Sequence, residues 1–237
     1  AAALPCVSRA TAAQFGERDR ARVIEDGLAV DPHRAPRQSA RAALGLSDDV
    51  PAIAVLGRIS DWKGQDVLVQ ALAEPALSEC GVVGLLAGDP WPGAQQRLSQ
   101  VLELAGRLGV SDRLRVLGFR EDLDNLLGAA DVIAVPSTAP DPLPGAAIEA
   151  AAAGCAVIAS AHGGLPEIIR DHETGRLVPP GDAGALARVA RELIDDIPQR
   201  ERLGAAASAD VRMRFAPGRL LDSIQGLYDE TLRGGAS

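Results

Sequence analysis

Two basic residues on one short segment could bind a phosphate. Residues 57–64 read Gly-Arg-Ile-Ser-Asp-Trp-Lys-Gly and follow an apolar run, which places Lys63 at the start of a helical pattern. An arginine such as Arg58 can hold phosphate oxygens with two parallel N–H groups, and a lysine adds a compact charge. A helix N-terminus contributes free N–H groups and partial positive charge. Lys63 is also the only lysine among 24 basic residues, which favours a specific role over chance placement.

Two carboxylates form a second candidate element. Asp141 and Glu149 stand eight positions apart across a Pro- and Gly-rich turn that leads into a helix. The backbone N–H groups of Gly145 and Ala146 would be free there to bind a diphosphate. Since phosphates repel carboxylates, the expected partners of the two acids are hydroxyls, those of a ribose and a sugar. The alternative is that Asp141 caps a turn and Glu149 is solvated, which fits Glu149 poorly because its neighbours are apolar.

A third candidate segment follows the next apolar run. It contains His162, the pair Gly163-Gly164 and Glu167, and the paired glycines allow a sharp strand-to-helix turn. Glu167 either braces that turn or faces the cleft. A catalytic role for His162 is the minor interpretation, because a single loop histidine is usually solvated.

The elements that must position these residues alternate along the chain. Short apolar runs predict strands at Ala52–Leu56, Val82–Ala87, Leu114–Leu117, Val132–Val135, Ala156–Ser160 and Arg176–Val178. Amphipathic segments between them predict helices at Gln65–Ala73, Ala94–Leu108, Glu121–Ala129 and Ala146–Ala153. This alternation is typical of βαβ units, and right-handed crossovers then give an α/β, Rossmann-like doubly wound parallel sheet. Ligands bind such sheets beyond the carboxyl ends of the strands, where the three segments above lie.

The two ends of the chain have a different pattern. From residue 182 onward only helices are expected, with breaks near Pro198 and Pro217. Residues 7–15 resemble a strand end that runs into a helix, and residues 23–36 resemble an extended linker. We therefore expect residues 1–36 to be the tail of a preceding domain with its linker, and residues 37–237 to form the Rossmann-like domain with C-terminal helices.

Composition excludes several classes of function. A formal net charge of −8 disfavours nucleic-acid binding, and no apolar run reaches the ~18 residues that span a bilayer. Aromatic residues make up only 3% of the chain, so the core should consist of Ala, Val, Leu and Ile. Cys6, Cys80 and Cys155 are widely spaced, and we expect each to be a small buried residue in a reducing, cytoplasmic protein without a metal site. Peripheral membrane attachment of a full-length protein stays open.

The combination resembles the donor-binding half of the retaining glycosyltransferases of family 4, also called glycosyl transferases group 1, which have the GT-B fold. Four matches in order carry the resemblance: Gly57-Arg58 with Lys63-Gly64, Asp141 with Glu149, Gly163-Gly164 with Glu167, and Gly175 with Leu177-Val178. Asp141 departs from the family, which usually has Glu at that position, and this leaves the identity of the sugar open.

The resemblance implies roles for ten residues. Arg58, Lys63 and Asp141 would be catalytic, the two cations holding the donor diphosphate and Asp141 contacting the transferred sugar. Donor binding would fall to Gly57, Phe119, Arg120, Leu143, Gly145, Ala146 and Glu149. Within this set Glu149 would bond the ribose, and Phe119 and Arg120 would meet the base largely through backbone.

The implied reaction is retaining transfer of a hexosyl group from a nucleoside diphosphate sugar to an acceptor hydroxyl. No cofactor or metal is expected, since the two cations would stabilise the leaving diphosphate. The acceptor, a sugar, lipid or small molecule, would bind a missing N-terminal domain, so the chain alone should bind nucleotide and transfer little. Three alternatives stay open: a GT-B-like sugar-nucleotide epimerase, a non-catalytic nucleotide-sugar-binding scaffold and a nicotinamide oxidoreductase. The last lacks a G-x-G-x-x-G after the first strand.

Overall fold

A six-stranded parallel sheet forms the centre of the chain. The computed structural model describes residues 3–15 and 20–234. The strands are β3 (Ala52–Leu56), β4 (Val83–Ala87), β5 (Leu114–Gly118), β6 (Val132–Val135), β7 (Val157–Ser160) and β8 (Arg176–Val178). Their order is β5-β4-β3-β6-β7-β8, and every neighbouring pair is parallel. All six predicted strands are confirmed, with ends that differ by at most one residue.

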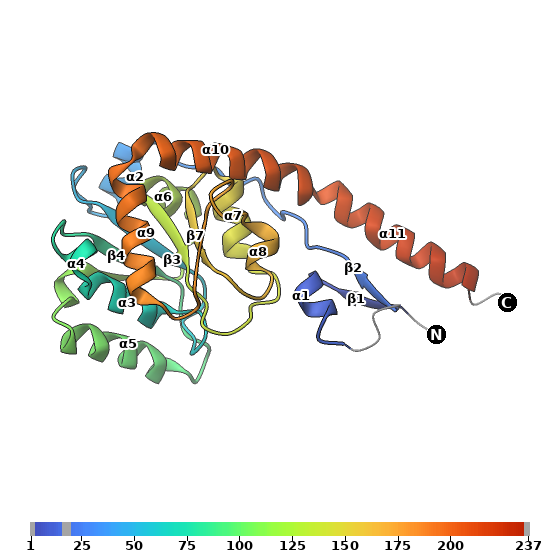
Figure 1. The fold of residues 1–237 in the computed structure, drawn as a ribbon, viewed down its shortest axis with the longest axis horizontal. Helices are drawn as coiled ribbons and strands as arrows, with labels where there is room; N and C mark the ends of the chain where they lie inside the picture. The colour runs from blue at the N-terminus through green and yellow to red at the C-terminus, as the bar shows by residue number, and fades with distance from the viewer. Residues whose placement is uncertain (1–2, 16–19, 235–237) are drawn as a thin grey trace.

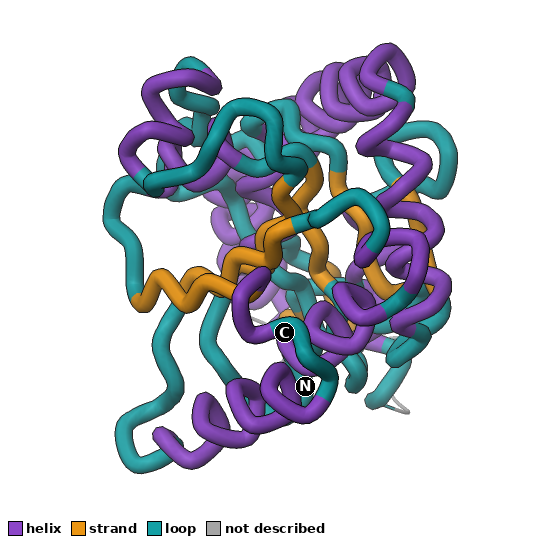
Figure 2. The backbone as a smooth tube through the Cα atoms, turned by 90° about the vertical axis from the view of Figure 1, so that its left-hand side faces the viewer, coloured by secondary structure: helices purple, strands orange, loops and turns teal. Residues whose placement is uncertain are grey.

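Helices cover both faces of this sheet (Figures 1 and 2). On one side lie α2 (Arg37–Ala43), α6 (Leu123–Ala129), α7 (Gly145–Ala152), α8 (Leu165–Ile168) and α10 (Ile197–Arg214). On the other lie α3 (Gln65–Ala73), α4 (Pro75–Ser78), α5 (Gln95–Arg107) and α9 (Ala183–Asp195), with the short 3-10 turn η1 (Ser111–Arg113) before β5. Side chains of β3 alternate between the two cores, Ala54 packing into one and Val55 into the other. The predicted doubly wound α/β fold is therefore confirmed.

The strand order creates a switch point beside β3. The chain runs outward from β3 through β4 to β5, then returns to β6 on the opposite side of β3. The loops that follow β3 and β6 therefore leave neighbouring strands in different directions. A crevice at the carboxyl ends of these two strands is the usual ligand site of such sheets.

The core consists almost wholly of small and aliphatic residues, as predicted. Among the described residues its exceptions are Phe215, Cys6 and Cys155, all buried. The three cysteines are free, and burial raises the pKa of the Cys155 thiol to about 11. Cys80 is only half-buried, because it follows α4 at the edge of the domain, so the prediction of burial was wrong for this residue.

Outside the main sheet, the N-terminal segment forms a small unit beside the last helix (Figure 1). It contains β1 (Leu4–Cys6), α1 (Arg9–Ala12) and β2 (Ala21–Val23), and its two strands pair in parallel. The carboxylate of Glu167 accepts the N–H groups of Arg9 and Ala10 at 2.9 and 2.7 Å, which joins this unit to α8. Glu167 thus braces a distant helix start, and the domain boundary near residue 36 stays a prediction.

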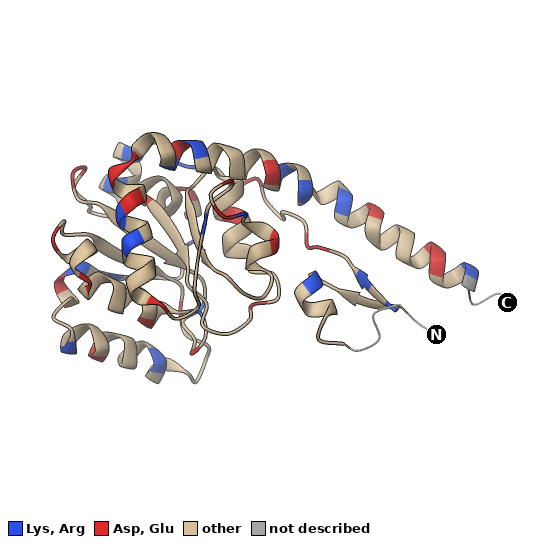
Figure 3. Cartoon of the chain, viewed as in Figure 1, with Lys and Arg blue, Asp and Glu red and all other residues tan. Residues whose placement is uncertain are grey.

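Three helices end the chain, with breaks where the prolines predicted them. Asp196 caps α10, whose second residue is Pro198, and α11 (Pro217–Gly234) begins at a proline. In the described part of the chain no helix is long and apolar enough to cross a membrane. Figure 3 shows basic and acidic residues interspersed along these helices.

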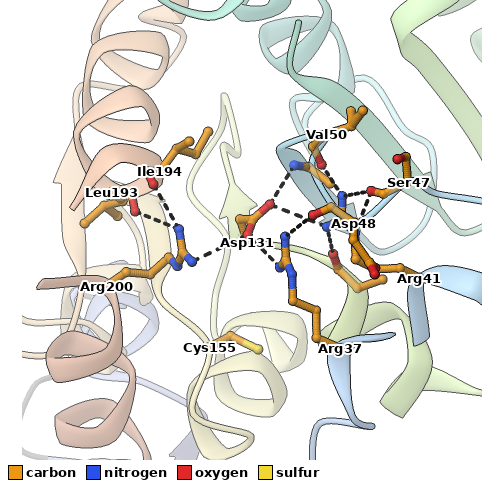
Figure 4. A network of polar contacts seen from close by, with 12 residues as sticks. Arg37, Arg41, Ser47, Asp48, Val50, Asp131, Cys155, Leu193, Ile194 and Arg200 are labelled. Atoms are coloured by element: carbon orange, nitrogen blue, oxygen red, sulfur yellow. Dashed lines mark hydrogen bonds and ion pairs between the residues drawn. The ribbon is translucent and has the colours of Figure 1, made fainter. Parts of the chain in front are cut away.

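A buried ionic network joins the elements at the amino ends of the strands (Figure 4). Asp131, just before β6, accepts from Arg37 at 2.7 Å and from the N–H of Ala52 at 2.9 Å, and Arg41 and Arg200 each lie 3.6 Å away. Burial lowers the pKa of Arg41, and the charge of Arg37 lowers it further, whereas Asp131 opposes the shift. The network lies at the end of the sheet opposite the switch point, so it stabilises the fold without touching the site.

Candidate functional site

A cavity of about 890 Å³ opens at the carboxyl ends of β3, β4 and β5. Its walls come from the loops after these strands and from the first turns of α7. Six of the ten predicted site residues line it: Gly57, Arg58, Phe119, Arg120, Ala146 and Glu149. Sequence reasoning therefore brought together residues that are more than 90 positions apart in the chain.

The loop after β3 carries Arg58 to the mouth of this cavity. Gly57 has φ of +127° and Gly88 has φ of +140°, and a Cβ on Gly88 would lie 2.1 Å from the Gly57 carbonyl oxygen. Gly88 is therefore needed for the loops after β3 and β4 to touch, whereas Gly57 is favoured by its positive φ alone. The Arg58 side chain is exposed, and its Cζ lies 3.6 Å from the centroid of the Trp91 ring.

Lys63 lies on the same loop but is paired with a carboxylate. Gly64 has φ of +78°, and a Cβ there would lie 1.9 Å from the carbonyl oxygen of Pro136, so the loops after β3 and β6 meet at this glycine. The contact brings Lys63 Nζ to 2.7 Å from Asp141 Oδ2. Two of the three predicted catalytic residues therefore form a salt bridge, and neither is among the residues that line the cavity.

The loop that carries Asp141 packs against the loop after β7. A Cβ on Gly163 would lie 2.5 Å from the Asp141 carbonyl oxygen, and one on Gly164 would lie 2.0 Å from that of Pro142. His162 lies 2.8 Å by its Nε2 from the Ser137 carbonyl oxygen, which requires the proton on Nε2. His162 therefore supports this loop, and the paired glycines are explained by the close approach of two backbones.

The N-terminus of α7 is open. Its N-cap is Pro144, which offers no side-chain acceptor, and within the described chain the N–H groups of Gly145 and Ala146 donate no hydrogen bond. Glu149 lies one turn further on, half-buried and without a hydrogen-bond partner among the described residues for its carboxylate. Burial raises the pKa of this carboxyl group. The free N–H donors at the start of α7 therefore lie beside the desolvated carboxylate of Glu149.

Two further lining residues, Phe119 and Arg120, follow β5. The Phe119 ring is 71% exposed and lines the cavity. Arg120 binds both oxygens of Asp122, at 2.7 and 2.5 Å, and these hydrogen bonds, with one from Asn125, lower the pKa of the Asp122 carboxyl. Asp122 thus holds the Arg120 side chain through Nε and Nη2, and the predicted backbone contact of Arg120 with a base stays a prediction.

Four of the ten predicted residues are not among those that line the cavity: Lys63, Asp141, Leu143 and Gly145. Leu143 differs most from the prediction. It is buried in the hydrophobic core, so any contact with a ligand would come from its backbone. Sequence reasoning also missed two residues on the loop after β4: Asp89, which lines the cavity, and Trp91, which contacts Arg58. The signal for Trp91 was its rarity, since the chain has only two tryptophans.

Comparison with known proteins identifies the family. The model of the family described as "Glycosyl transferases group 1" matches residues 36–210, about three quarters of the chain. The chain belongs to the group 1 glycosyltransferases. The resemblance inferred from four short motifs is therefore confirmed.

Relatives among the group 1 glycosyltransferases are similar over most of this chain. The D-inositol 3-phosphate glycosyltransferase of Mycolicibacterium smegmatis is 34% identical over 219 residues, which is 91% of this chain and 49% of that protein. This chain thus spans about half the length of the curated relatives it matches.

Two solved structures share the fold. HepE from Anabaena, in complex with UDP and glucose, is 28% identical with a TM-score of 0.88, covering 97% of this chain and 63% of that one. Sucrose-phosphate synthase from Thermosynechococcus elongatus is 30% identical with a TM-score of 0.84, covering 97% and 58%. The architecture is that of one half of a GT-B glycosyltransferase.

Proposed function

We propose that this chain is the donor-binding half of a retaining hexosyltransferase and binds a nucleoside diphosphate sugar. The observation that carries the proposal is the cavity itself, which is lined by Arg58, by Ala146 at the open N-terminus of α7 and by Glu149. Cations and free N–H groups bind phosphate, and an isolated carboxylate binds hydroxyls. The solved complexes of HepE with UDP make uridine nucleotides the first ligands to test.

The proposed chemistry is stabilisation of a leaving group. When the bond between the anomeric carbon and the diphosphate oxygen breaks, negative charge develops on that oxygen. Arg58, Lys63 and the N–H groups of Gly145 and Ala146 would stabilise this charge. The fold holds these groups in place before the reaction, so little movement of the protein is required as the charge develops.

The Lys63–Asp141 salt bridge fits a shared role in donor binding. An ammonium group has three N–H donors, and Asp141 uses one of them, which leaves two for phosphate oxygens. Asp141 Oδ1 makes no hydrogen bond within the described residues and would accept a hydroxyl of the transferred sugar. Lys63 would thereby link the diphosphate to the sugar contact.

Glu149 is the proposed ribose ligand. Its raised pKa reflects a carboxylate that burial has deprived of water, and two ribose hydroxyls would replace the lost hydrogen bonds. Phe119 would lie against the base, where an apolar ring face tolerates any base.

Calorimetry tests the proposal directly. We expect UDP and UDP-glucose to bind, and GDP and ADP are the comparison ligands. Arg58→Ala should weaken binding at least about tenfold, because a charge-assisted hydrogen bond contributes ~1.5–3 kcal/mol. Arg107→Ala is the matched control, since Arg107 is an exposed arginine of α5 whose side chain makes no ion pair or hydrogen bond with the described residues. If no nucleoside diphosphate bound at millimolar concentration, the proposal would be wrong.

A second part of the proposal concerns where the acceptor binds. Because the chain spans about half of its curated relatives, we propose that acceptor contacts come from residues beyond these 237. The isolated chain should then bind nucleotide and transfer almost no sugar. Sustained transfer of glucose from UDP-glucose by the chain alone would contradict this.

A further inference from the structure

The chain has two tryptophans, and each lies against one of the two proposed diphosphate-binding cations. Arg58 Cζ is 3.6 Å from the centroid of the Trp91 ring, and Lys63 Nζ is 4.4 Å from that of Trp62. Trp62 is the chain neighbour of Lys63, so their proximity follows from the sequence. Trp91 is 33 positions from Arg58, so only the fold brings these two together.

A tight turn places Trp91 beside Arg58. The Trp91 carbonyl oxygen accepts the N–H of Ala94 at 2.8 Å, and between them stand Pro92 and Gly93, the latter with φ of +86°. Proline followed by a glycine with positive φ is the pattern of a type II turn. The sequence of this loop therefore determines which way the tryptophan leaves the backbone.

A second set of contacts holds this turn against the loop after β3. Arg97, in the first turn of α5, donates to the Ser60 carbonyl oxygen at 3.2 Å and lies 3.3 and 3.2 Å from the carboxylates of Asp61 and Asp66. The N–H of Ile59 donates to the Asp89 carbonyl oxygen at 3.1 Å. The Trp91–Arg58 contact therefore joins two loops that are already fastened to each other.

Stacking positions an arginine without using its hydrogen-bond donors. The guanidinium lies over the ring, with Cζ 3.6 Å from the centroid. A guanidinium stacked on an aromatic face keeps its N–H groups, which lie in its own plane, available for other acceptors. The Arg58 side chain makes no ion pair or hydrogen bond within residues 3–15 and 20–234. Arg120 is the contrast, because Asp122 occupies two of its donors. A carboxylate beside Arg58 would compete with phosphate, whereas an indole does not.

Stacking against Arg58 would explain why Trp91 lies at the surface rather than in the core. Its side chain is 53% exposed in a chain with few aromatic residues, and the hydrophobic core does not include it. A large apolar ring that stays in water gains little from burial. We propose that Trp91 is a positioning residue that holds the Arg58 guanidinium at the cavity mouth for the diphosphate, a role that rests on the proposed function.

A double-mutant cycle measured by calorimetry with UDP tests this role. Trp91→Leu should weaken UDP binding about two- to fivefold, the range expected for an exposed cation–π contact. In an Arg58→Ala background the same change should have almost no effect, because the tryptophan acts through the arginine. Trp91→Phe, which keeps an aromatic face, should restore most of the affinity that leucine loses.

Three results of this experiment would overturn the positioning role of Trp91. If Trp91→Leu weakens binding equally with and without Arg58, then Trp91 contacts the nucleotide itself and the positioning role is wrong. If leucine serves as well as phenylalanine, bulk rather than the aromatic face matters, and the role is again wrong. If the unchanged protein binds no UDP, GDP or ADP, the proposed function fails first and this role fails with it.

Discussion

The ammonium of Lys63 donates to Asp141 Oδ2 across 2.7 Å, joining two residues that are 78 positions apart. The Lys63 side chain is 21% exposed and that of Asp141 only 5%. The bridge is therefore largely buried, and it connects the loops that follow β3 and β6. The pair joins two loops of the fold, and we proposed that it also binds the donor; experiment can separate the two roles.

Lys63→Ala should destabilise the fold by about 2–3 kcal/mol, because it leaves a buried carboxylate without its cation. The double variant Lys63→Ala with Asp141→Asn should recover most of this loss, since no unpaired charge remains. UDP binding should stay weak in both variants. Chemical denaturation and calorimetry measure the two effects, and a double variant that binds UDP normally would remove Lys63 from the site.

Glu149→Gln should stabilise the unliganded protein above the pKa of Glu149. A carboxyl whose pKa is raised in the folded state contributes stability below its ordinary pKa and loses it as pH rises through the raised value. Glutamine avoids that loss, so we expect the Tm to rise by roughly 2 °C at pH 7.5 and to change little at pH 4. A gain that is equal at both pH values would contradict the electrostatic cause.

The same variant tests the ribose contact. UDP should bind the unchanged protein more tightly than 2′,3′-dideoxyuridine diphosphate, which lacks both ribose hydroxyls. Glu149→Gln should lose most of this preference, and the unchanged protein should lose it as pH falls through the raised pKa, where the carboxyl becomes protonated. A preference that survives the substitution would place the ribose elsewhere.

Gly64→Ala should destabilise the fold by at least about 3 kcal/mol, since the added Cβ would lie 1.9 Å from the Pro136 carbonyl oxygen. Gly81→Ala is the matched control. Gly81 has φ of +64°, close to the +78° of Gly64, but nothing lies within 4 Å of its added Cβ. It should cost only about 1–2 kcal/mol, the strain of the left-handed conformation. If urea denaturation showed that both variants lose the same free energy of unfolding, the close approach of the loops after β3 and β6 would be refuted.

Asp131→Asn should cost about 3–5 kcal/mol of stability, because it leaves Arg37, Arg41 and Arg200 near one another without their shared anion. Under conditions where the variant is still folded, its affinity for UDP should equal that of the unchanged protein, since Asp131 lies at the far end of the sheet. A large change in UDP affinity with unchanged stability would contradict the assignment of stability to the amino ends of the strands and of binding to their carboxyl ends.

The sequence by itself determined the architecture and predicted which loops would carry the candidate site. Apolar runs of four to six residues predict buried strands directly, because burial on both faces leaves no polar positions. Parallel strands place their following loops at one edge, so Arg58 and Glu149 could be assigned to the same cavity before any contact was known.

Only the tertiary structure decided which side chains touch. Lys63 binds Asp141, Arg58 contacts Trp91, and Glu167 binds the start of α1. None of these contacts corresponds to a periodic pattern in the sequence. They depend on how closely two loops approach, and glycines at 64, 88, 163 and 164 set that distance. A glycine in a sequence shows that something must come close, but its partner is known only once the backbones are packed.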